Sequence, residues 1–287
     1  MKIQEKCLPC IVNQVLKVAN MVGLTDKDEL LKKVFVYLSK ADFKQATTPE
    51  LIGDIFEILK QETGNDDPYK ETRDHYNSMF LDLIPTYEQA INEADEPFLM
   101  AIKYAIIGNI IDFNPIHNTL LSDIENCFAM ANTETLAIDD SKQLMEDVQH
   151  ARTVLYLGDN CGEICLDKIL VKKLKELNPF CDIYFATRGS AVVNDSIEED
   201  AYFVGMDTYA SILSNGDHSL GTVLHKTSKE FQNIYHKADI IIAKGQANYE
   251  CLSNEKRNIY FLLMTKCVVI ADDIGVAEKK MICKKQQ

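Results

Sequence analysis

The feature that most constrains the fold is a series of short apolar runs after residue 150, separated by segments with helical periodicity. The runs are Thr153–Leu157, Cys181–Ala186, Ile240–Ala243 and Ile259–Leu263. Between the first two, apolar residues recur at helical spacing from Leu166 to Leu177, and Asn178-Pro179 ends the pattern. Short buried strands that alternate with helices predict parallel βαβ units. We therefore expect an α/β domain at residues 149–287, with a mainly parallel sheet covered on both faces.

Residues 1–148 follow a different pattern, which predicts an all-helical N-terminal domain. Apolar residues from Ile11 to Val22 repeat on one helical face. The sequence Thr-Pro-Glu at 48–50 is typical of a helix start, because proline loses no hydrogen bond in the first turn. Strand patterns are scarce in this half. We expect the joint between the two domains near Asp139-Asp140-Ser141.

The charge balance excludes some classes of partner. The formal net charge is −14, whereas nucleic acids and anionic membranes are bound by clustered lysine and arginine, so we expect neither as a partner. An anionic substrate would need local positive charge from a metal ion, a few cations or helix N-termini. No stretch approaches the roughly 20 apolar residues of a membrane span. The nine cysteines, without a secretory signal sequence, predict reduced thiols in the cytoplasm.

Polar clusters follow each of the four expected strands. They are Gly158–Glu163, Thr187–Asp195, Lys244–Glu250 and Thr265-Lys266. Because the carboxyl ends of parallel strands lie at one edge of a sheet, the clusters should meet there. Singly, each has a plainer explanation: Gly-Asp-Asn is common in turns, Ser196 and Glu199 fit a helix capping box, and a lysine is usually solvated. Their coincidence at one edge favours a functional site.

The residue types at this edge suit phosphate chemistry with a hard cation. Carboxylate and amide oxygens without paired Cys or His ligands favour Mg²⁺ or Mn²⁺ over Zn²⁺. Glycines let backbone N–H groups approach a phosphate, and lysines neutralise its charge. The chain has no GxxxxGK[ST] sequence, which excludes a P-loop enzyme. No GxGxxG follows a strand either, which disfavours a dinucleotide site.

On these residues the chain resembles the DUF89 damage-control phosphatases, in particular the prokaryotic-type subgroup with an N-terminal CxxC. The matching segments run in order across nearly the whole chain: Cys7–Cys10 with Gln14, Thr48–Leu51, Asp67–Lys70 with Asn77, Gly108–Asp112, Gly158–Glu163, Arg188–Asp195, Lys244–Glu250 and Lys266-Cys267. Two departures from the family pattern are Asn114, where a glycine is common, and Ser190-Ala191, where a proline is common.

The resemblance implies a helical N-terminal part packed on a Rossmann-like α/β/α sandwich. It also implies divalent-metal-dependent hydrolysis of phosphomonoesters of small metabolites, such as sugar phosphates. By matching position, the ligands of Mg²⁺, Mn²⁺, Co²⁺ or Ni²⁺ would be Asp159, Asn160 and Asp195. The implied catalytic residues are Asp159, Asp195, Lys244 and Lys266. The implied substrate contacts are Asn160, Arg188, Gly245, Asn248, Glu250 and Lys266.

The roles of several residues have more than one interpretation. The nucleophile is a metal-bound water or one of the two aspartates, and we favour water. Arg188 fits either a grip on a distal part of the substrate or a surface ion pair. Glu163 fits a carboxylate behind the metal ligands or a favourable charge at a helix N-terminus. Cys7 and Cys10 fit a second metal site, a redox role or helix packing, because a lone CxxC is a weak signal.

Two other functions fit the same residues. S-adenosylmethionine-dependent carboxyl methyl transfer is also attributed to relatives of this family, but the Asp-Asn pair and the lysines suit phosphate better than a methyl donor. A non-catalytic sensor of sugar phosphates or nucleotides would use the same ligands as an enzyme. For the candidates for the leaving-group pocket, a structural role is the simpler interpretation. They are Asp67, Tyr69, Lys70, Asn77, Asn109 and Asp112.

Overall fold

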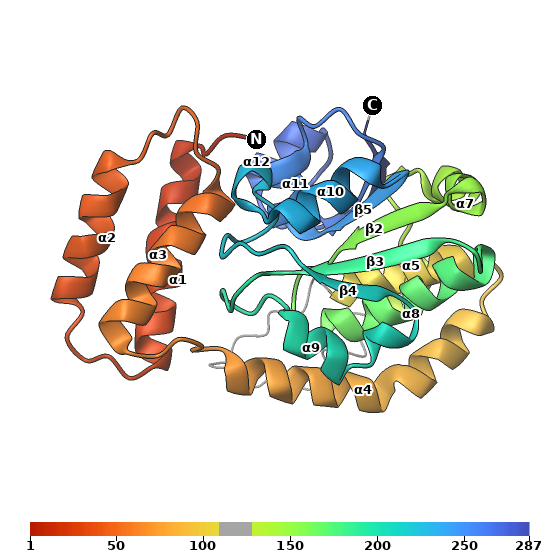
Figure 1. Cartoon of the computed structure of the whole chain (residues 1–287), viewed down its shortest axis with the longest axis horizontal. Helices are drawn as coiled ribbons and strands as arrows, with labels where there is room; N and C mark the ends of the chain where they lie inside the picture. The colour runs from red at the N-terminus through yellow and green to blue at the C-terminus, as the bar shows by residue number, and fades with distance from the viewer. Residues whose placement is uncertain (109–127, 287) are drawn as a thin grey trace.

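The computed structural model describes residues 1–108 and 128–286, which form a helical unit beside an α/β/α sandwich (Figure 1). Asn109, Asp112 and Asn114 lie outside the described residues. The strands are β1 (Ile138–Asp139), β2 (Thr153–Leu157), β3 (Asp182–Thr187), β4 (Ser211–Ser214), β5 (Ile240–Lys244), β6 (Ile259–Met264) and β7 (Met281–Lys285). The helices of the sandwich are α4 (Lys70–Asn92), α5 (Pro97–Ile107), α7 (Ser141–His150), α8 (Glu163–Leu177), α9 (Glu198–Phe203), α10 (Lys229–Lys237), α11 (Gly245–Leu252) and α12 (Val268–Ile274).

The sheet has the order β1-β7-β6-β5-β2-β3-β4, and its neighbouring strands are parallel except for β6 and β7. From β2 the chain runs outward through β3 and β4, then returns to β5 on the other side of β2. The strand order therefore reverses between β2 and β5. Ligands of open α/β sheets bind at the carboxyl ends of the strands beside such a reversal.

Alternate side chains of the central strands supply two separate apolar cores. In β2, Val154 and Tyr156 lie in the core shared with α4, α5 and α8, whereas Leu155 and Leu157 lie in the core shared with α10, α11 and α12. This two-sided burial explains why the strands read as continuous apolar runs in the sequence. The expected Rossmann-like sandwich with a mainly parallel sheet is confirmed.

The helical unit consists of α1 (Leu8–Met21), α2 (Asp28–Lys40) and α3 (Thr48–Thr63). The Thr47 hydroxyl caps α3 by accepting from the backbone N–H of Glu50 at 3.3 Å. Gly64 ends the helix at φ +65°, a left-handed conformation that favours glycine. The core of this unit also takes in Val192, which is only 1% exposed and belongs to the loop after β3. The helical unit thus packs directly on a loop of the sandwich.

The packing differs from the domain boundary expected at residue 148. Helices α4 and α5 share the apolar core of the sheet, so the change of core falls between α3 and α4 (Figure 1). The joint expected at Asp139-Asp140-Ser141 is instead strand β1 followed by α7, with the Asp139 carboxylate accepting from the N–H of Ser141 at 3.0 Å. Strands β4 and β7 were also missed. Among the described residues, no helix combines the length and apolarity needed to cross a bilayer.

Candidate metal and phosphate site

The loop after β2 carries Asp159 and Asn160. The preceding Gly158 fits against the Phe185 ring, where a Cβ would collide, and its N–H donates to the carbonyl of Ala186 at 3.0 Å. This anchors the loop to the end of β3. Asp159 follows with only 6% of its surface exposed. A buried acidic side chain directly after a central strand lies where the reversal of strand order places ligands.

The loop after β3 folds back on the β2 loop and brings Asp195 beside Asn160. The N–H of Ser196 donates to the carbonyl of Asp159, and the N–H of Cys161 donates to the carbonyl of Asn194, each at 2.8 Å. Between these bonds, Asn160 and Asp195 form an isolated antiparallel bridge. The three residues predicted as metal ligands are thus brought together from two loops, and their role as ligands stays a prediction.

Arg188, at the end of β3, lies between the two aspartates. Its Nε donates to Asp195 Oδ2 at 2.6 Å, and its Nη2 donates to Asp159 Oδ1 at 3.3 Å. The side chain is 2% exposed. Arg188 is therefore neither a surface ion pair nor a grip on a distal part of a substrate. It fixes one carboxylate oxygen of each predicted ligand.

The amide of Asn160 is oriented by two carboxylates. Its Nδ2 donates to Asp159 Oδ2 at 2.9 Å and to Glu163 Oε2 at 3.1 Å. With the nitrogen held in this way, the amide presents its oxygen as the acceptor. Glu163 begins α8 and is fully buried, which agrees with both roles considered for it: a carboxylate behind the predicted ligands and a favourable charge at a helix N-terminus.

Lys244 does not face a substrate phosphate as the sequence led us to expect. Its ammonium is fully buried and donates to Glu163 Oε1, to Asp167 Oδ1 at 2.5 Å and to the carbonyl of Ala105 at 2.8 Å. These three acceptors use its three donors. The hydroxyl of Tyr156 completes the network by donating to Asp167 at 2.7 Å. Lys244 therefore fixes Glu163, which in turn orients Asn160.

Two residues expected to bind substrate hold the loops together instead. Gly245 has φ +75°, and a Cβ there would overlap the Asp159 carboxylate. The buried amide of Asn248 donates to the carbonyls of Gly158 at 3.2 Å and of Lys244 at 2.7 Å. It also accepts from the hydroxyl of Thr222 at 2.8 Å. Asn248 thus ties the end of β5 to the end of β2.

Glu250 and Lys266 differ in position. Burial raises the pKa of Glu250 to about 7, an effect that its neighbour Thr48 on α3 reduces. Glu250 thus lies in the contact between the helical unit and α11. Lys266 is exposed, and its backbone N–H donates to the Gln246 side chain at 2.5 Å. Its charge lowers the pKa values of Asp159 and Asp195, so it stands near both.

The buried charges of this cluster do not balance. Four buried carboxylates, Asp159, Glu163, Asp167 and Asp195, face two buried cations, Arg188 and Lys244. Burial raises the pKa of Asp159 well above its ordinary value, and the charges of Asp195 and Glu163 raise it further. Burial also raises the pKa of Asp195, although Arg188 opposes the shift. With all four carboxyls ionised, the cluster would carry two more negative than positive charges, which equals the charge of one divalent cation.

The donor set fits a hard cation. Two aspartates and an amide offer the oxygen ligands that Mg²⁺ and Mn²⁺ prefer. Within residues 1–108 and 128–286, no three His, Cys, Asp or Glu side chains converge as a metal cluster. The amide oxygen of Asn160 would therefore be the third donor beside the two aspartates. Cys7 lies at the start of α1 and Cys10 is exposed in its first turn, and a metal at this pair stays a prediction.

Sequence reasoning missed several residues around the site. Asp167 lies four residues after Glu163 on α8, so helical spacing places both on one face, and that signal was available. The capping box expected from Ser196 and Glu199 is absent. Instead, Asp200 accepts from the N–H of Ile197, the residue before α9, at 2.8 Å. Nothing in the local sequence distinguishes Asp200 from the acidic residues beside it.

The chain is similar to known proteins over nearly all of its length. Residues 3–282 match the family model described as the damage-control phosphatase ARMT1-like domain. A damage-control phosphatase of Pyrococcus horikoshii is 32% identical, over 100% of this chain and 99% of its own. A damage-control phosphatase of Archaeoglobus fulgidus is 31% identical, over 99% of each chain. The crystal structure of a DUF89 family protein from P. horikoshii has a TM-score of 0.92 and 32% identity, over 100% of both chains.

Proposed function

Since this chain belongs to the damage-control phosphatases with an ARMT1-like domain, we propose that its phosphatase activity resides where β2, β3 and β5 end and depends on one divalent cation. The enzyme acts on a small phosphorylated substrate. The observation that carries the assignment of the site is the convergence of Asp159, Asn160 and Asp195 in a buried cluster of four carboxyl groups and two cations.

Asp159, Asn160 and Asp195 would hold the cation, with Mg²⁺ or Mn²⁺ the best match to an all-oxygen set and Co²⁺ or Ni²⁺ as alternatives. When bound, the cation supplies Lewis-acid polarisation of a phosphoryl oxygen. Arg188 keeps the two carboxylates apart and fixes their orientation through one oxygen of each. The Asn160 amide oxygen is presented by Glu163, which Lys244 holds in place.

Lys266 is the cation best placed to meet the substrate phosphate. It is exposed, whereas Arg188 and Lys244 are buried against carboxylates. Its ammonium would neutralise charge that spreads over the phosphoryl oxygens during transfer. We assign the attack to a water molecule, because each aspartate already engages Arg188. The carboxylates are better suited to orient groups than to form a covalent intermediate.

The substrate class that this arrangement supports is a phosphomonoester of a small, soluble metabolite, such as a sugar phosphate. The loop that carries Asp195 packs on the helical unit through Val192, and we therefore assign the leaving-group side of the site to that unit. The cysteines described in the structure are unpaired, which supports a reducing compartment such as the cytoplasm.

Phosphate release from a panel of sugar phosphates tests the proposal. The enzyme should release phosphate with Mg²⁺ or Mn²⁺ and lose this activity in EDTA. Asp159→Asn and Asp195→Asn should each lose nearly all turnover while keeping the circular-dichroism spectrum of the wild type. Retained turnover in either variant would exclude this site. Methyl transfer from S-adenosylmethionine, or binding of the panel without phosphate release, would instead support one of the alternative functions.

A further inference from the structure

We propose that Asn77 and Asp200 form a positioning pair that sets the distance between the two loops carrying the cation ligands. The inference rests on the proposed function, because it concerns the same ligands. The pair acts on the backbone of the two loops and not on the ligand side chains themselves. Each residue holds a backbone N–H two residues beyond a ligand, one in the β2 loop and one in the β3 loop.

Asn77 connects helix α4 to the β2 loop. The residue is fully buried, and its Oδ1 accepts from the N–H of Gly162 at 2.7 Å. Its Nδ2 donates to Asp200 Oδ1 at 3.0 Å. Gly162 lies two residues after Asn160 and has φ +67°, so the chain turns sharply there before α8 begins. The amide of Asn77 therefore reaches from the turn after one ligand to the helix that follows another.

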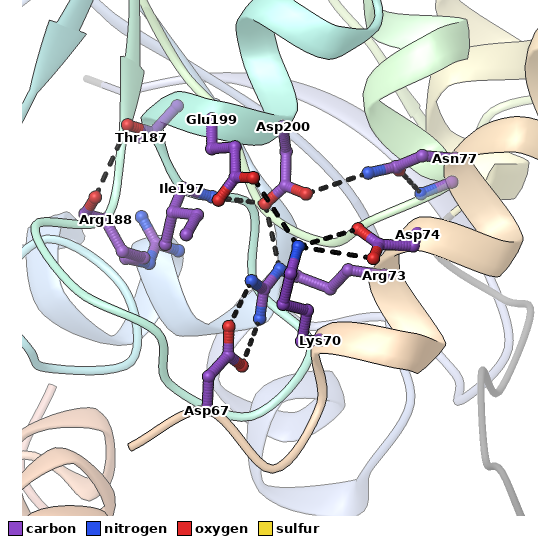
Figure 2. Close-up of polar contacts among 11 residues, drawn as sticks. Asp67, Lys70, Arg73, Asp74, Asn77, Thr187, Arg188, Ile197, Glu199 and Asp200 are labelled. Carbon is purple, nitrogen blue, oxygen red and sulfur yellow. Dashed lines mark hydrogen bonds and ion pairs between the residues drawn. The ribbon is translucent and has the colours of Figure 1, made fainter.

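Asp200 connects the same helix to the β3 loop. Its Oδ2 accepts from the N–H of Ile197 at 2.8 Å and from Arg73 Nε at 2.9 Å. Arg73 is itself fixed, because its two terminal nitrogens donate to the Asp67 carboxylate at 2.7 and 2.6 Å. Figure 2 shows Arg73 between Asp67 and Asp200, with the side chain of Asn77 pointing toward Asp200. Both carboxylate oxygens of Asp200 therefore act as acceptors of specific hydrogen bonds.

The direction of every hydrogen bond in this pair is determined. Because Gly162 donates, Asn77 must present its oxygen to Gly162 and its nitrogen to Asp200. Because Ile197 and Arg73 both donate, position 200 must present an acceptor to them. Helix α4 already packs on the sheet through apolar residues such as Phe80 and Ile91. The polar pair is therefore not needed to attach the helix, and its contribution is to orient the two loops. This is the pattern of groups that orient metal ligands from behind.

The pair permits a reciprocal exchange that tests the proposal. In Asn77→Asp, two carboxylates face each other at a distance where the wild type has a hydrogen bond. In Asp200→Asn, the new amide cannot accept from Ile197 without turning its nitrogen toward the nitrogen of Asn77. In the double variant N77D/D200N, the amide at 200 donates to the carboxylate at 77, and all the other bonds keep their direction. Each single variant thus loses one bond that the double variant regains.

The readout is the dissociation constant of Mn²⁺, measured on the metal-free chain by electron paramagnetic resonance. We expect each single variant to bind Mn²⁺ about 10- to 100-fold more weakly, and the double variant to return to within about threefold of the wild type. Ile91→Ala is the matched control: it lies on the same helix, is equally buried and loses packing, but should leave Mn²⁺ affinity unchanged. Wild-type affinity in both single variants, or no recovery in the double variant, would overturn the proposal.

Amide hydrogen exchange separates this inference from the proposed function. The N–H groups of Gly162 and Ile197 should exchange faster in each single variant than in Ile91→Ala, and their protection should return in the double variant. This measurement is made without metal. If the wild type bound no Mn²⁺, the proposed cation site would fail, and hydrogen exchange would still decide whether the pair holds the two loops. Unchanged protection of these N–H groups in the single variants would show that Asn77 and Asp200 do not hold the two loops.

Discussion

The α-carbon of Gly245 lies against the carboxylate of Asp159, so that a Cβ at this position would occupy the space of Asp159 Oδ2. Gly245 follows β5 and Asp159 follows β2, the two strands between which the strand order reverses. The close approach explains why a glycine opens α11, and φ +75° adds a second reason. The position of the Asp159 carboxylate therefore depends on a residue of the neighbouring loop.

Replacing Gly245 by alanine should displace Asp159. We expect kcat/KM for a phosphomonoester to fall on the order of 100-fold, because small displacements of a catalytic group are costly. Gly275→Ala is the control, since Gly275 also has positive φ, at +83°, but has open space where a Cβ would stand. Steady-state kinetics on both variants provide the measurement. Equal losses in the two variants would mean that backbone strain, and not the contact with Asp159, is responsible.

Removing the charge of Lys244 and removing that of Lys266 should have different effects on stability and activity. Lys244→Met leaves Glu163 and Asp167 without their buried cation and should lower the free energy of unfolding by about 3–5 kcal/mol. Lys266→Met, on the surface, should change it by less than about 0.5 kcal/mol but reduce kcat/KM on the order of 100-fold. Urea unfolding and steady-state kinetics distinguish the two roles. A stable Lys244→Met variant would contradict the role that we assign to the buried network.

The lowered pKa of the Asp147 carboxyl should make the stability of the fold depend on pH under acidic conditions. Burial opposes its ionisation, but hydrogen bonds from Lys285 at 2.6 Å and Tyr260 at 2.7 Å lower its pKa to about 2. A lowered pKa stabilises the fold above the ordinary value near 4, and this stabilisation is lost as the pH falls toward 2. With an allowance for solvent screening, we expect Asp147→Asn to cost about 1–2 kcal/mol at pH 6. Urea unfolding at pH 6, 4 and 3 should show this difference shrinking; a constant difference would exclude the linkage.

The sequence predicted the elements whose apolar pattern is continuous and missed those that depend on distant partners. Strand β2 is found with the predicted bounds, because its residues are buried on both faces. Strand β1 has only two residues and pairs with β7, at the other end of the domain, so no local pattern identifies it. The boundary expected at residue 148 does not coincide with the change of core between α3 and α4, because the helical patterns of α4 and α5 do not indicate whether they cover a sheet or another helix.

At the site, the sequence indicated which residues gather but not which of them face outward. The proximity of Asp159, Asn160 and Asp195 was predictable because strand ends share an edge, and their role as metal ligands stays a prediction. Lys244 and Arg188 were expected to contact substrate because a cation beside a phosphate site is the simplest interpretation. The structure buries both against carboxylates, and those partners come from α8 and from the loops after β2 and β3. Such pairings depend on tertiary distances, which no spacing along the chain encodes.

The central claim is that Asp159, Asn160 and Asp195 bind one divalent cation, and titration of the metal-free chain with Mn²⁺ tests it most directly. We predict one bound Mn²⁺ per wild-type chain, and a loss of affinity of at least about 100-fold in Asp159→Asn and in Asp195→Asn. Both variants should melt in EDTA at or above the wild-type temperature, since each removes a carboxylate from a cluster with excess negative charge. One Mn²⁺ bound with wild-type affinity in either variant would contradict the account.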